Sequence, residues 1–532
     1  MGGEEKNDLL PPWRSRPSRR NARTGIRTGI RTGIPACGPP RRRSALAILI
    51  LVAFFFFLKP DALPFGFGAN RPDRPGLQYS PACANPVDHL RKPSYKLTRN
   101  VIYQKRCIRP TIDRKVDRTA LTSIAEPLVG EGQLLQLDKS CAGWQQPKCD
   151  PIKLKVPPAY PMMDYSHLLF GVATTLERLI DSMGQFESWI ADSGASLLAV
   201  ITDAKPKGDA KQDAVFEKVT RQFRARGIDI TIRQPWNTTA TQNEQHFTII
   251  RDLRRHATQD TKWAAIVDDD TFFPSLYPLA EILDKHDHTV PAYLGALSDN
   301  ADAVKHHGFM AFGGAGIFLS LSLLKELDPH IEACLGEEHV PQGDGLLRAC
   351  IYGKTKTELT VIKGLHQLDM GHDLSGLYES GTLPISLHHW KSWHHSPVDE
   401  MVKISEFCGS CFLQRFQFGS DTILSNGFSI AMYPEGTRSV NLTEMEGTFD
   451  GYPGFEWSLG PMRLPLDRFH KKSYRLVESE KLGRNLRQIF VHRVEDDLPT
   501  MGEIEAAGGV KNVKLPKISE MRDEVVELWW EW

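Results

Sequence analysis

The chain lacks net charge: its 532 residues contain 65 Lys and Arg against 65 Asp and Glu. The balance is uneven along the chain, because residues 1–43 hold eleven basic and three acidic residues, an excess of eight positive charges. Arg-Thr-Gly-Ile occurs three times in tandem within residues 23–34. A basic, low-complexity arm of this kind is predicted to be disordered and could bind nucleic acid. The segment that follows it favours a different interpretation.

The sequence has no apolar run of the roughly 20 residues that usually span a bilayer. Residues 45–58 form a shorter run, preceded by three Arg and followed by Lys59. Snorkelling of the flanking cations or a thin membrane can accommodate such a span. A cleaved signal peptide or a buried soluble helix are the alternatives, but the preceding arm is long and no A-x-A site follows closely. We therefore predict a transmembrane signal anchor at 44–58, with a cytosolic N-terminus and a lumenal remainder.

No second C-x-x-C accompanies Cys408-Gly-Ser-Cys411, so a zinc site of two such motifs is not predicted and a disulfide is the better interpretation. Eight of the nine cysteines follow the predicted anchor, an even number that suits disulfides in an oxidising compartment. Cys37 precedes the anchor and is predicted to be free. Cys334 and Cys350 bracket a short loop and are predicted to pair. Two N-glycosylation sequons begin at Asn237 and Asn441.

The sequence also lacks a G-x-G-x-x-G nucleotide fingerprint, although it has a glycine cluster, Gly313-Gly314-Ala315-Gly316. A tight turn or bulge would explain these glycines. Close approach of a ligand to the backbone would explain them equally well, since glycine has no side chain to block it. Both interpretations stay open at this point.

From residue 165 onward, strand and helix patterns alternate regularly. Strands are predicted at 167–174, 195–202, 228–233 and 263–267, with helices at 176–190, 210–226 and 243–257 between them. This order predicts a mostly parallel α/β sheet with helices on both faces. Strand-like segments beyond residue 400 predict an antiparallel β appendage. The predicted domains are a disordered basic cytosolic arm (1–43), the anchor (44–58), a stem with a small Cys-containing subdomain (59–158), an α/β domain (159–400) and the appendage (401–532).

Three consecutive carboxylates, Asp268-Asp269-Asp270, end the apolar strand at 263–267. Crowding three negative charges is unfavourable unless something neutralises them. Hard divalent cations prefer oxygen ligands, and ligands of open α/β sheets bind at the carboxyl ends of the strands. The triplet therefore suits a site for a metal and a diphosphate. Alternatively, Asp270 caps a helix that begins near Pro274 and the other two acids are solvated.

Two later segments carry further candidates. Asp344 lies in the loop between Cys334 and Cys350, where it could act chemically or simply cap the helix predicted at 346–352. Residues 384–395 hold four His and two Trp. Such histidines are usually structural, but imidazole is also a common ligand of transition metals, and aromatic rings suit sugars and bases.

Taken in order, four motifs resemble those of glycosyltransferase family 31, the Fringe-like and core 1 β3-galactosyltransferase-like enzymes, and within it a fungal branch. They are Val267-Asp268-Asp269-Asp270-Thr271-Phe272, then Gly313-Gly314-Ala315-Gly316-Ile317, then Gly343-Asp344 with the flanking Cys pair, then Ile385-Ser386-Leu387-His388-His389-Trp390. The resemblance covers roughly residues 160–400. It implies a GT-A fold, which is a Rossmann-like, mostly parallel sheet that binds a nucleotide-sugar.

The resemblance also implies a cofactor and roles for individual residues. The cofactor is a divalent cation, usually Mn²⁺, with Asp270, His388 and Asp268 as its ligands. The donor-binding residues are Asp268, Asp269, Gly313, Gly314 and Gly316. Asp344 matches the acid proposed as general base. One departure is that many relatives have two adjacent acids where this chain has Gly343-Asp344.

These expectations describe a Golgi membrane protein, single-pass with a lumenal catalytic domain. It would transfer a hexose or N-acetylhexosamine from a UDP-sugar to a glycan or glycoprotein acceptor with inversion, and would not bind nucleic acid. One alternative is a catalytically inactive, Fringe-like carbohydrate-binding protein, which would be expected to have lost Asp270 or His388. Another is a metal-dependent lumenal hydrolase, which would need a nucleophile or a second metal site, and no second acidic cluster is present.

Overall fold

The computed structural model describes residues 87–138, 148–205, 208–335, 343–449, 456–509, 513 and 521–531, all of which belong to the unit Gly76–Trp532. The predicted arm at 1–43, the anchor at 44–58 and Cys37 lie outside the described residues. None of the helices within those described ranges combines the length and apolar character needed to cross a membrane.

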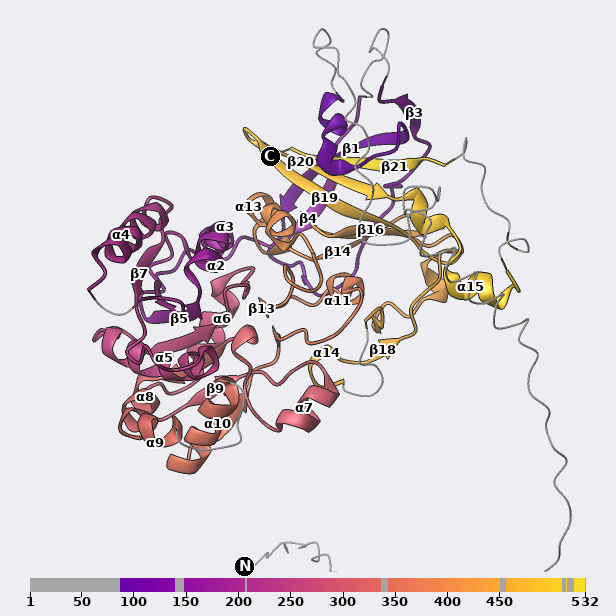
Figure 1. Ribbon diagram of the computed structural model, residues 1–532. Coiled ribbons are helices and arrows are strands. Elements are labelled where there is room, and N and C mark those ends of the chain that lie inside the picture. The colour runs from indigo at the N-terminus through magenta and orange to yellow at the C-terminus, as the bar shows by residue number, and fades with distance from the viewer. Residues whose placement is uncertain are drawn as a thin grey trace, which may run out of the picture. The chain divides into compact units, whose positions relative to one another are not determined.

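Seven strands form the first sheet (Figure 1). They are β5 (Leu168–Thr174), β6 (Ser196–Ile201), β7 (Asp229–Arg233), β8 (Trp263–Val267), β9 (Tyr293–Gly295), β10 (Ile317–Ser320) and β11 (Leu359–Val361), in the order β11-β9-β10-β8-β5-β6-β7. In this sheet β10 pairs antiparallel with both neighbours, while the other pairings are parallel. The prediction of a mostly parallel sheet is confirmed.

Helices cover both faces of this sheet. Adjacent residues of a strand point to opposite faces, and all residues of β5 are buried, so both faces have to be covered. Phe170 of β5 joins the core formed with α2 (Leu176–Asp181), α3 (Met183–Ile190), α4 (Ala210–Arg224) and α6 (Leu276–Leu283). Leu169, its neighbour, joins the opposite core with α5 (Gln242–His256), α8 (Leu321–Leu327), α9 (Ile331–Leu335) and α10 (Gly343–Lys354). The predicted layered α/β architecture is thus confirmed.

Ten strands form the second sheet, which joins two distant parts of the chain. They are β1 (Asn100–Ile112), β2 (Thr122–Ile124), β3 (Gln133–Gln136), β4 (Ile152–Val156), β14 (Arg415–Phe418), β15 (Thr422–Ser425), β16 (Ser429–Met432), β19 (Lys472–Leu482), β20 (Asn485–His492) and β21 (Asp523–Trp530). The strands from β14 to β21 are antiparallel neighbours, as predicted for the appendage. However, β21 pairs in parallel with β1. The stem (59–158) and the appendage (401–532), treated as separate regions from the sequence, therefore contribute to one sheet.

Short elements connect and flank the two sheets. They are α7 (Ala301–His307), β12 (Leu365–His366), α11 (Ser375–Glu379), β13 (Ser386–Leu387), α12 (Val398–Met401), α13 (Ser405–Cys408), β17 (Met445–Glu446), α14 (Glu456–Leu459), β18 (Met462–Arg463) and α15 (Met501–Ala506), with 3-10 turns at Asp88–Arg91, Pro93–Tyr95, Gly313–Ala315, Asp328–His330, Val402–Ile404, Gly409–Cys411, Thr437–Ser439 and Val494–Asp497. One apolar cluster runs through both sheets, from Phe170 to Trp530.

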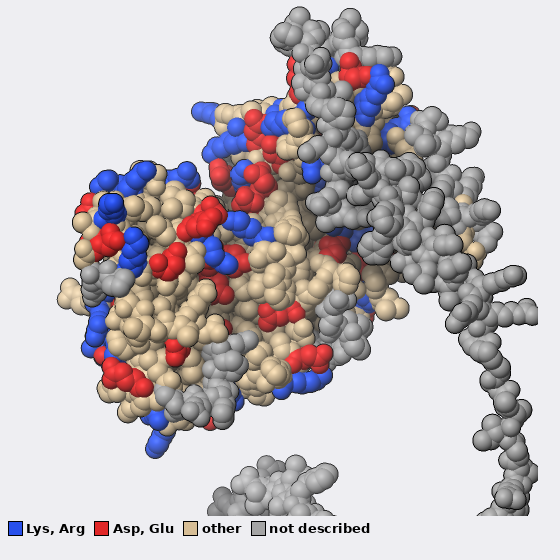
Figure 2. All heavy atoms as spheres, viewed as in Figure 1, with Lys and Arg blue, Asp and Glu red and all other residues tan. Residues whose placement is uncertain are grey.

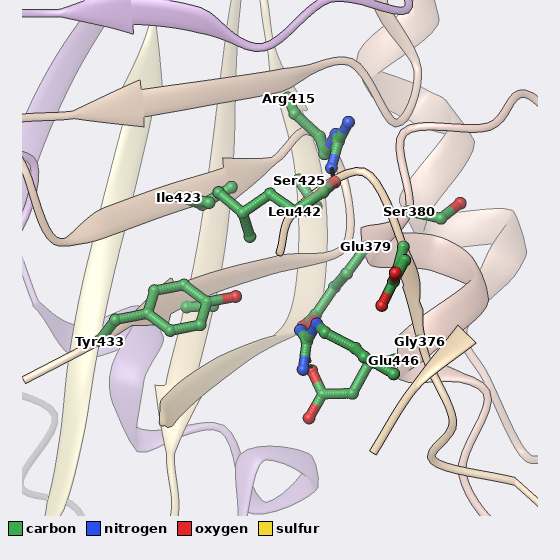
Figure 3. Close-up of a pocket in the computed structure, with 12 residues that line it drawn as sticks. Gly376, Glu379, Ser380, Arg415, Ile423, Ser425, Tyr433, Leu442 and Glu446 are labelled. Atoms are coloured by element: carbon green, nitrogen blue, oxygen red, sulfur yellow. Dashed lines mark hydrogen bonds and ion pairs between the residues drawn. The ribbon is translucent and has the colours of Figure 1, made fainter. Parts of the chain in front are cut away.

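A buried ion network joins α11 to the ten-stranded sheet. Lys471, which precedes β19, contacts Glu379 at 2.5 Å and Glu446 at 2.7 Å, and all three side chains are at least nine-tenths buried. Glu379 and Glu446 both line a cavity of about 20 Å³, and their carboxylates lie close to each other there (Figure 3). That volume is room for about one water molecule. The network is therefore a structural contact and not a ligand site.

Charged side chains on the surface are interspersed. On the face shown in Figure 2, acidic and basic residues lie among each other without a large area of one sign. Exposed pairs such as Lys481 with Glu406 at 2.7 Å contribute to this pattern. Such pairs stabilise a fold by about 0–1 kcal/mol each, so they contribute little beside the apolar cores.

Candidate active site

The acidic triplet stands at the end of β8, in the middle of the seven-stranded sheet, and all five residues of β8 are buried. The Asp268 amide donates to Thr271 Oγ1 at 2.9 Å, and that hydroxyl donates to the Gly314 carbonyl at 2.9 Å. The following helix, α6, is capped by Ser275, whose Oγ accepts the Tyr277 amide. The alternative in which Asp270 caps this helix is therefore excluded.

His388 reaches the triplet through a short backbone pairing. Phe272 and Leu387 exchange hydrogen bonds of 2.9 Å in both directions, which places the residue after β13 beside the end of β8. His388 Nε2 then lies 3.0 Å from Asp270 Oδ1 and 3.2 Å from Asp268 Oδ2. The structure thus brings together the three residues that the sequence predicts as metal ligands.

The other ring nitrogen of His388 is held by the backbone. Its Nδ1 lies 3.2 Å from the Gln367 carbonyl, and donation of the Nδ1 proton to that oxygen directs Nε2 at the carboxylates. Burial lowers the pKa of His388, but hydrogen bonds and charge from Asp268 and Asp270 outweigh this and raise it to about 10. Burial alone would raise the pKa of Asp270, but His388 and Ser392 hold it well below its usual range.

Asp269 faces different partners from the other two acids. Both its carboxylate oxygens bind the Arg178 guanidinium, with Nε 2.6 Å from Oδ2, and Oδ2 also accepts the Thr174 hydroxyl. Its predicted donor-binding role stays a prediction, and what the structure shows is an ion pair that fixes Arg178. Arg178 was not a candidate from the sequence, although its place one turn after β5 puts it at the ligand-binding edge of the sheet.

The glycine cluster allows other side chains to approach the backbone closely. A Cβ on Gly314 would lie 2.2 Å from ring atoms of His388, so only glycine fits beneath that ring. The Gly313 amide donates to Asp344 Oδ2 at 2.8 Å. Gly316 has φ +102°, which favours glycine. These glycines therefore allow His388 and Asp344 to approach the turn, and their predicted contact with a donor stays a prediction.

Asp344 lies in the first turn of α10. Its carboxylate accepts a hydrogen bond from the Gly313 amide, so it does more than cap this helix. Burial, and then the charge of Asp268, raise the pKa of Asp344 to about 6. His246 of α5 stands nearby, with Nδ1 3.9 Å from Asp268 Oδ1. No pattern in the sequence points to His246, because a single His on an amphipathic helix has no distinctive spacing.

His389 lies close to the metal-ligand candidates. Asp270, His388 and His389 offer three ligand atoms within 4.8 Å of one another. The nitrogens of His389 face Ser392 Oγ and Asp369 Oδ1, each at 3.2 Å, and Ser392 Oγ also donates to Asp270 Oδ2 at 2.7 Å. His389 therefore braces the site and offers a ligand atom beside those of Asp270 and His388.

The described residues form three disulfides, one of which links the helix that carries Asp344 to a neighbouring helix. Cys334 and Cys350 are bonded as predicted and tie α9 to α10. Cys408 and Cys411 are bonded as well. A third bond, between Cys107 and Cys149, joins β1 to the segment before β4 and was not predicted.

Comparison with known proteins gives one family match and a set of distant structures. A model of the family described as "Protein of unknown function, DUF604" matches residues 302–404. No curated protein sequence matches the chain.

Several solved structures resemble part of the chain. The mannosyltransferase PcManGT from Pyrobaculum calidifontis, in complex with GDP-Man and Mn²⁺, shares 13% identity over 37% of this chain and 56% of its own, with a TM-score of 0.24. The galactosyltransferase LgtC, in complex with donor and acceptor sugar analogs, shares 10% identity over 46% of this chain and 95% of its own, with a TM-score of 0.28. Mouse xyloside xylosyltransferase 1 shares 11% identity over 42% of this chain and 97% of its own, with a TM-score of 0.27. The chain thus spans little more than half the length of the first of these structures.

Proposed function

We propose that the protein is a metal-dependent glycosyltransferase that transfers a hexose or N-acetylhexosamine from a UDP-sugar to a glycan or glycoprotein acceptor. The observation that carries the proposal is the convergence of Asp268, Asp270 and His388 at the end of β8, with Asp344 across the glycine turn. The segment matched by the family model, 302–404, contains three of the four motifs on which the resemblance to family 31 rests.

The donor side of the site would hold a cation and a diphosphate. Two carboxylates and an imidazole are a ligand set that suits Mn²⁺ and related ions. When bound, such an ion neutralises negative charge on the leaving nucleotide. Arg178, about three-fifths exposed and fixed by Asp269, offers a further positive charge to the diphosphate from the same sheet edge.

Asp344 would act as the general base. With a pKa near 6 it is mostly a carboxylate at neutral pH and can still accept a proton. It would take the proton of the acceptor hydroxyl as that oxygen bonds to the anomeric carbon and the bond to UDP breaks. A single displacement inverts the anomeric centre, so a UDP-α-sugar gives a β-linked product. A positioned base of this kind contributes roughly 10²- to 10⁴-fold.

We further propose that the catalytic unit is lumenal in the Golgi, anchored by residues 44–58. In sealed microsomes, a protease added outside should remove an epitope at residue 1 and leave the rest intact. Protection of that epitope would overturn the topology while leaving the chemistry untouched.

Calorimetry of UDP with Mn²⁺, beside a transfer assay over a panel of UDP-sugars, tests the activity. Asp270→Asn should weaken metal-dependent UDP binding sharply, whereas Asp344→Asn should keep UDP binding and lose transfer, because a base acts only in the chemical step. Asp302→Asn, on an exposed part of α7, is the matched control and should change neither. Equal loss of UDP binding in both site variants contradicts the role of Asp344. Glycan binding without transfer by the wild type would favour the inactive carbohydrate-binding alternative, and sugar release without an acceptor would favour the hydrolase.

A further inference from the structure

A second cavity lies at the outer edge of the seven-stranded sheet. Its volume is about 350 Å³, and residues from β7, the following loop, α4 and α5 line it. β7 is the edge strand, and β6 and β5 separate it from β8, whose end carries the acidic triplet. The cavity is therefore distinct from the candidate active site, and its size is at the lower end for small-molecule sites.

Two residues that line this cavity each carry a buried polar atom with no hydrogen-bond partner among the described residues. The atoms are Gln234 Oε1, an acceptor, and Trp236 Nε1, a donor, and Gln234 is only 9% exposed. Buried polar groups without partners are rare in native proteins because they cost free energy. Both atoms are covered by protein in this structure, so a ligand in the cavity would reach them only after these side chains turn toward it.

The charges around the cavity restrict what such a ligand can be. Arg233 and Arg255 line it together with Asp213 and Asp252, and Arg233 Nη1 lies 3.7 Å from Asp252 Oδ1. An anionic ligand would meet the two carboxylates, and a cationic ligand would meet the two guanidinium groups. A neutral ligand with many hydroxyl groups can bind both kinds, since each hydroxyl donates and accepts.

One of the two aromatic residues that line the cavity, Trp236, is held in place. The Arg251 guanidinium lies 4.4 Å from the Trp236 ring centroid and is itself fixed by Asp328 at 2.9 Å and Glu332 at 2.6 Å. A fixed indole offers an apolar surface and one polar N–H at little entropic cost. An apolar ring face together with hydroxyl partners is the combination that a sugar ring requires.

We propose that this edge cavity is a binding site for a neutral saccharide. Two sources share that chemistry. The sequon at Asn237 directly follows Trp236, and Asn237 Oδ1 accepts the Thr239 hydroxyl at 2.8 Å, so an N-glycan there would begin beside the cavity. The other source is a sugar of a separate glycan. The proposal does not depend on the proposed transferase activity.

Saturation-transfer NMR on the full-length protein, without UDP or Mn²⁺, tests the site. The probes are glucose, galactose, mannose, N-acetylglucosamine and its β1,4-linked dimer, and Asn237→Gln removes the sequon. We expect Asn237→Gln protein to bind at least one probe, and added Gln234→Leu to weaken that binding at least tenfold. Gln234→Leu removes a buried polar atom that has no partner, so the melting temperature should stay level or rise.

Three further variants separate this site from others. Arg255→Ala on the wall should weaken saccharide binding, whereas Asp270→Asn at the active site and Phe469→Ala, an exposed aromatic beside the ten-stranded sheet, should not. If Gln234→Leu and Arg255→Ala both leave binding unchanged, the proposal is overturned. Absence of UDP–Mn²⁺ binding would contradict the transferase proposal alone, because the saccharide measurement uses neither.

Glycosylated protein distinguishes the two sources. If the glycan on Asn237 occupies the cavity, an endoglycosidase should remove it more slowly than the glycan on Asn441, and free saccharide should bind only after its removal. If a separate glycan is the ligand, probes should bind the glycosylated and unglycosylated proteins equally. The proposal is wrong if no probe binds unglycosylated protein and the two glycans are cleaved at the same rate.

Discussion

The two sheets differ in how their strands are drawn from the chain. In the seven-stranded sheet, β5, β6, β7 and β8 follow one another with one helical region between each pair, and the acidic triplet ends the fourth. In the ten-stranded sheet, β1 lies between β21 and β3 and so unites distant segments. None of the residues predicted for the site lies on the ten-stranded sheet. The candidate site thus lies in the sheet whose first four strands alternate with helices, although its residues come from segments spread over 268–388. We expect the second sheet to stabilise the fold around it.

The largest effect is expected from breaking the buried ion network, which tests whether the ten-stranded sheet stabilises the fold without positioning the site. Lys471→Met leaves the buried Glu379 without this cation, whereas Glu446 keeps Arg463 at 2.8 Å, and breaking a buried pair costs about 3–5 kcal/mol. Urea unfolding should show this loss of stability, while UDP–Mn²⁺ affinity of the folded protein stays within about twofold. Lys481→Met, which breaks an exposed pair with Glu406, is the control and should cost about 0–1 kcal/mol. A parallel fall in affinity would show that the ten-stranded sheet also positions the site.

Removing the disulfide next to Asp344 comes second. Cys334 and Cys350 are 16 residues apart, and in the chain-entropy model closing such a loop is worth about 3 kcal/mol. Replacing both by Ser should lower the free energy of unfolding by that amount. The Cys408–Cys411 bond has a separation of 3, and its double Ser variant should lose only about 2 kcal/mol. Equal losses would mean that native-state contacts, and not loop closure, set the values.

Gly314→Ala affects the site without removing any ligand. Its new Cβ would lie 2.2 Å from the His388 ring, which must move away from Asp268 and Asp270. Disturbing the orientation of a metal ligand typically costs about 10- to 100-fold in affinity, so UDP–Mn²⁺ binding should fall within that range. Gly184→Ala is the control, since a Cβ there meets nothing within 4 Å. Unchanged affinity in Gly314→Ala would contradict the assignment of His388 as a ligand.

The pH dependence of transfer gives the smallest effect. Only the carboxylate form of Asp344 can act as base, and burial and Asp268 raise its pKa to about 6. The value of kcat/KM should therefore be level above about pH 7 and fall about tenfold per pH unit below 6. At saturating donor and metal, the bound cation neutralises the charge of Asp268, which lowers the pKa of Asp344. The midpoint of the pH profile of kcat should therefore move to lower pH. A profile that stays level down to pH 5 would indicate that Asp344 is not the base.

Part of the site could be predicted because it depends on local patterns. An apolar strand that ends in acids fixed the place of Asp270, and an apolar stretch before His388 indicated a second strand end. Their approach through Phe272 and Leu387 follows from two strand ends that meet at one edge. The pairing of Asp269 with Arg178 was not predictable, because three identical side chains in a row give no sign of which one turns away.

The pairing of β1 with β21 was also beyond sequence reasoning. Each strand shows β propensity, but its partner lies more than 400 residues away, and register between such strands depends on the finished packing. The role of Gly314 was similarly hidden. The sequence left open whether a tight turn or a close approach explains the glycine cluster, and only the fold shows that a ring of the same chain lies against Gly314.

The β1–β21 pairing has a consequence for the order of events during synthesis. About 410 residues separate the end of β1 at Ile112 from the start of β21 at Asp523. At a translation rate of about 5–20 residues per second, β1 therefore waits roughly 20–80 s for this partner. The seven-stranded sheet ends at Val361 and can close earlier. During that interval one edge of β1 is open to wrong partners. The nascent chain would thus hold an assembled sheet at its acidic triplet while its other sheet still needs protection by a chaperone.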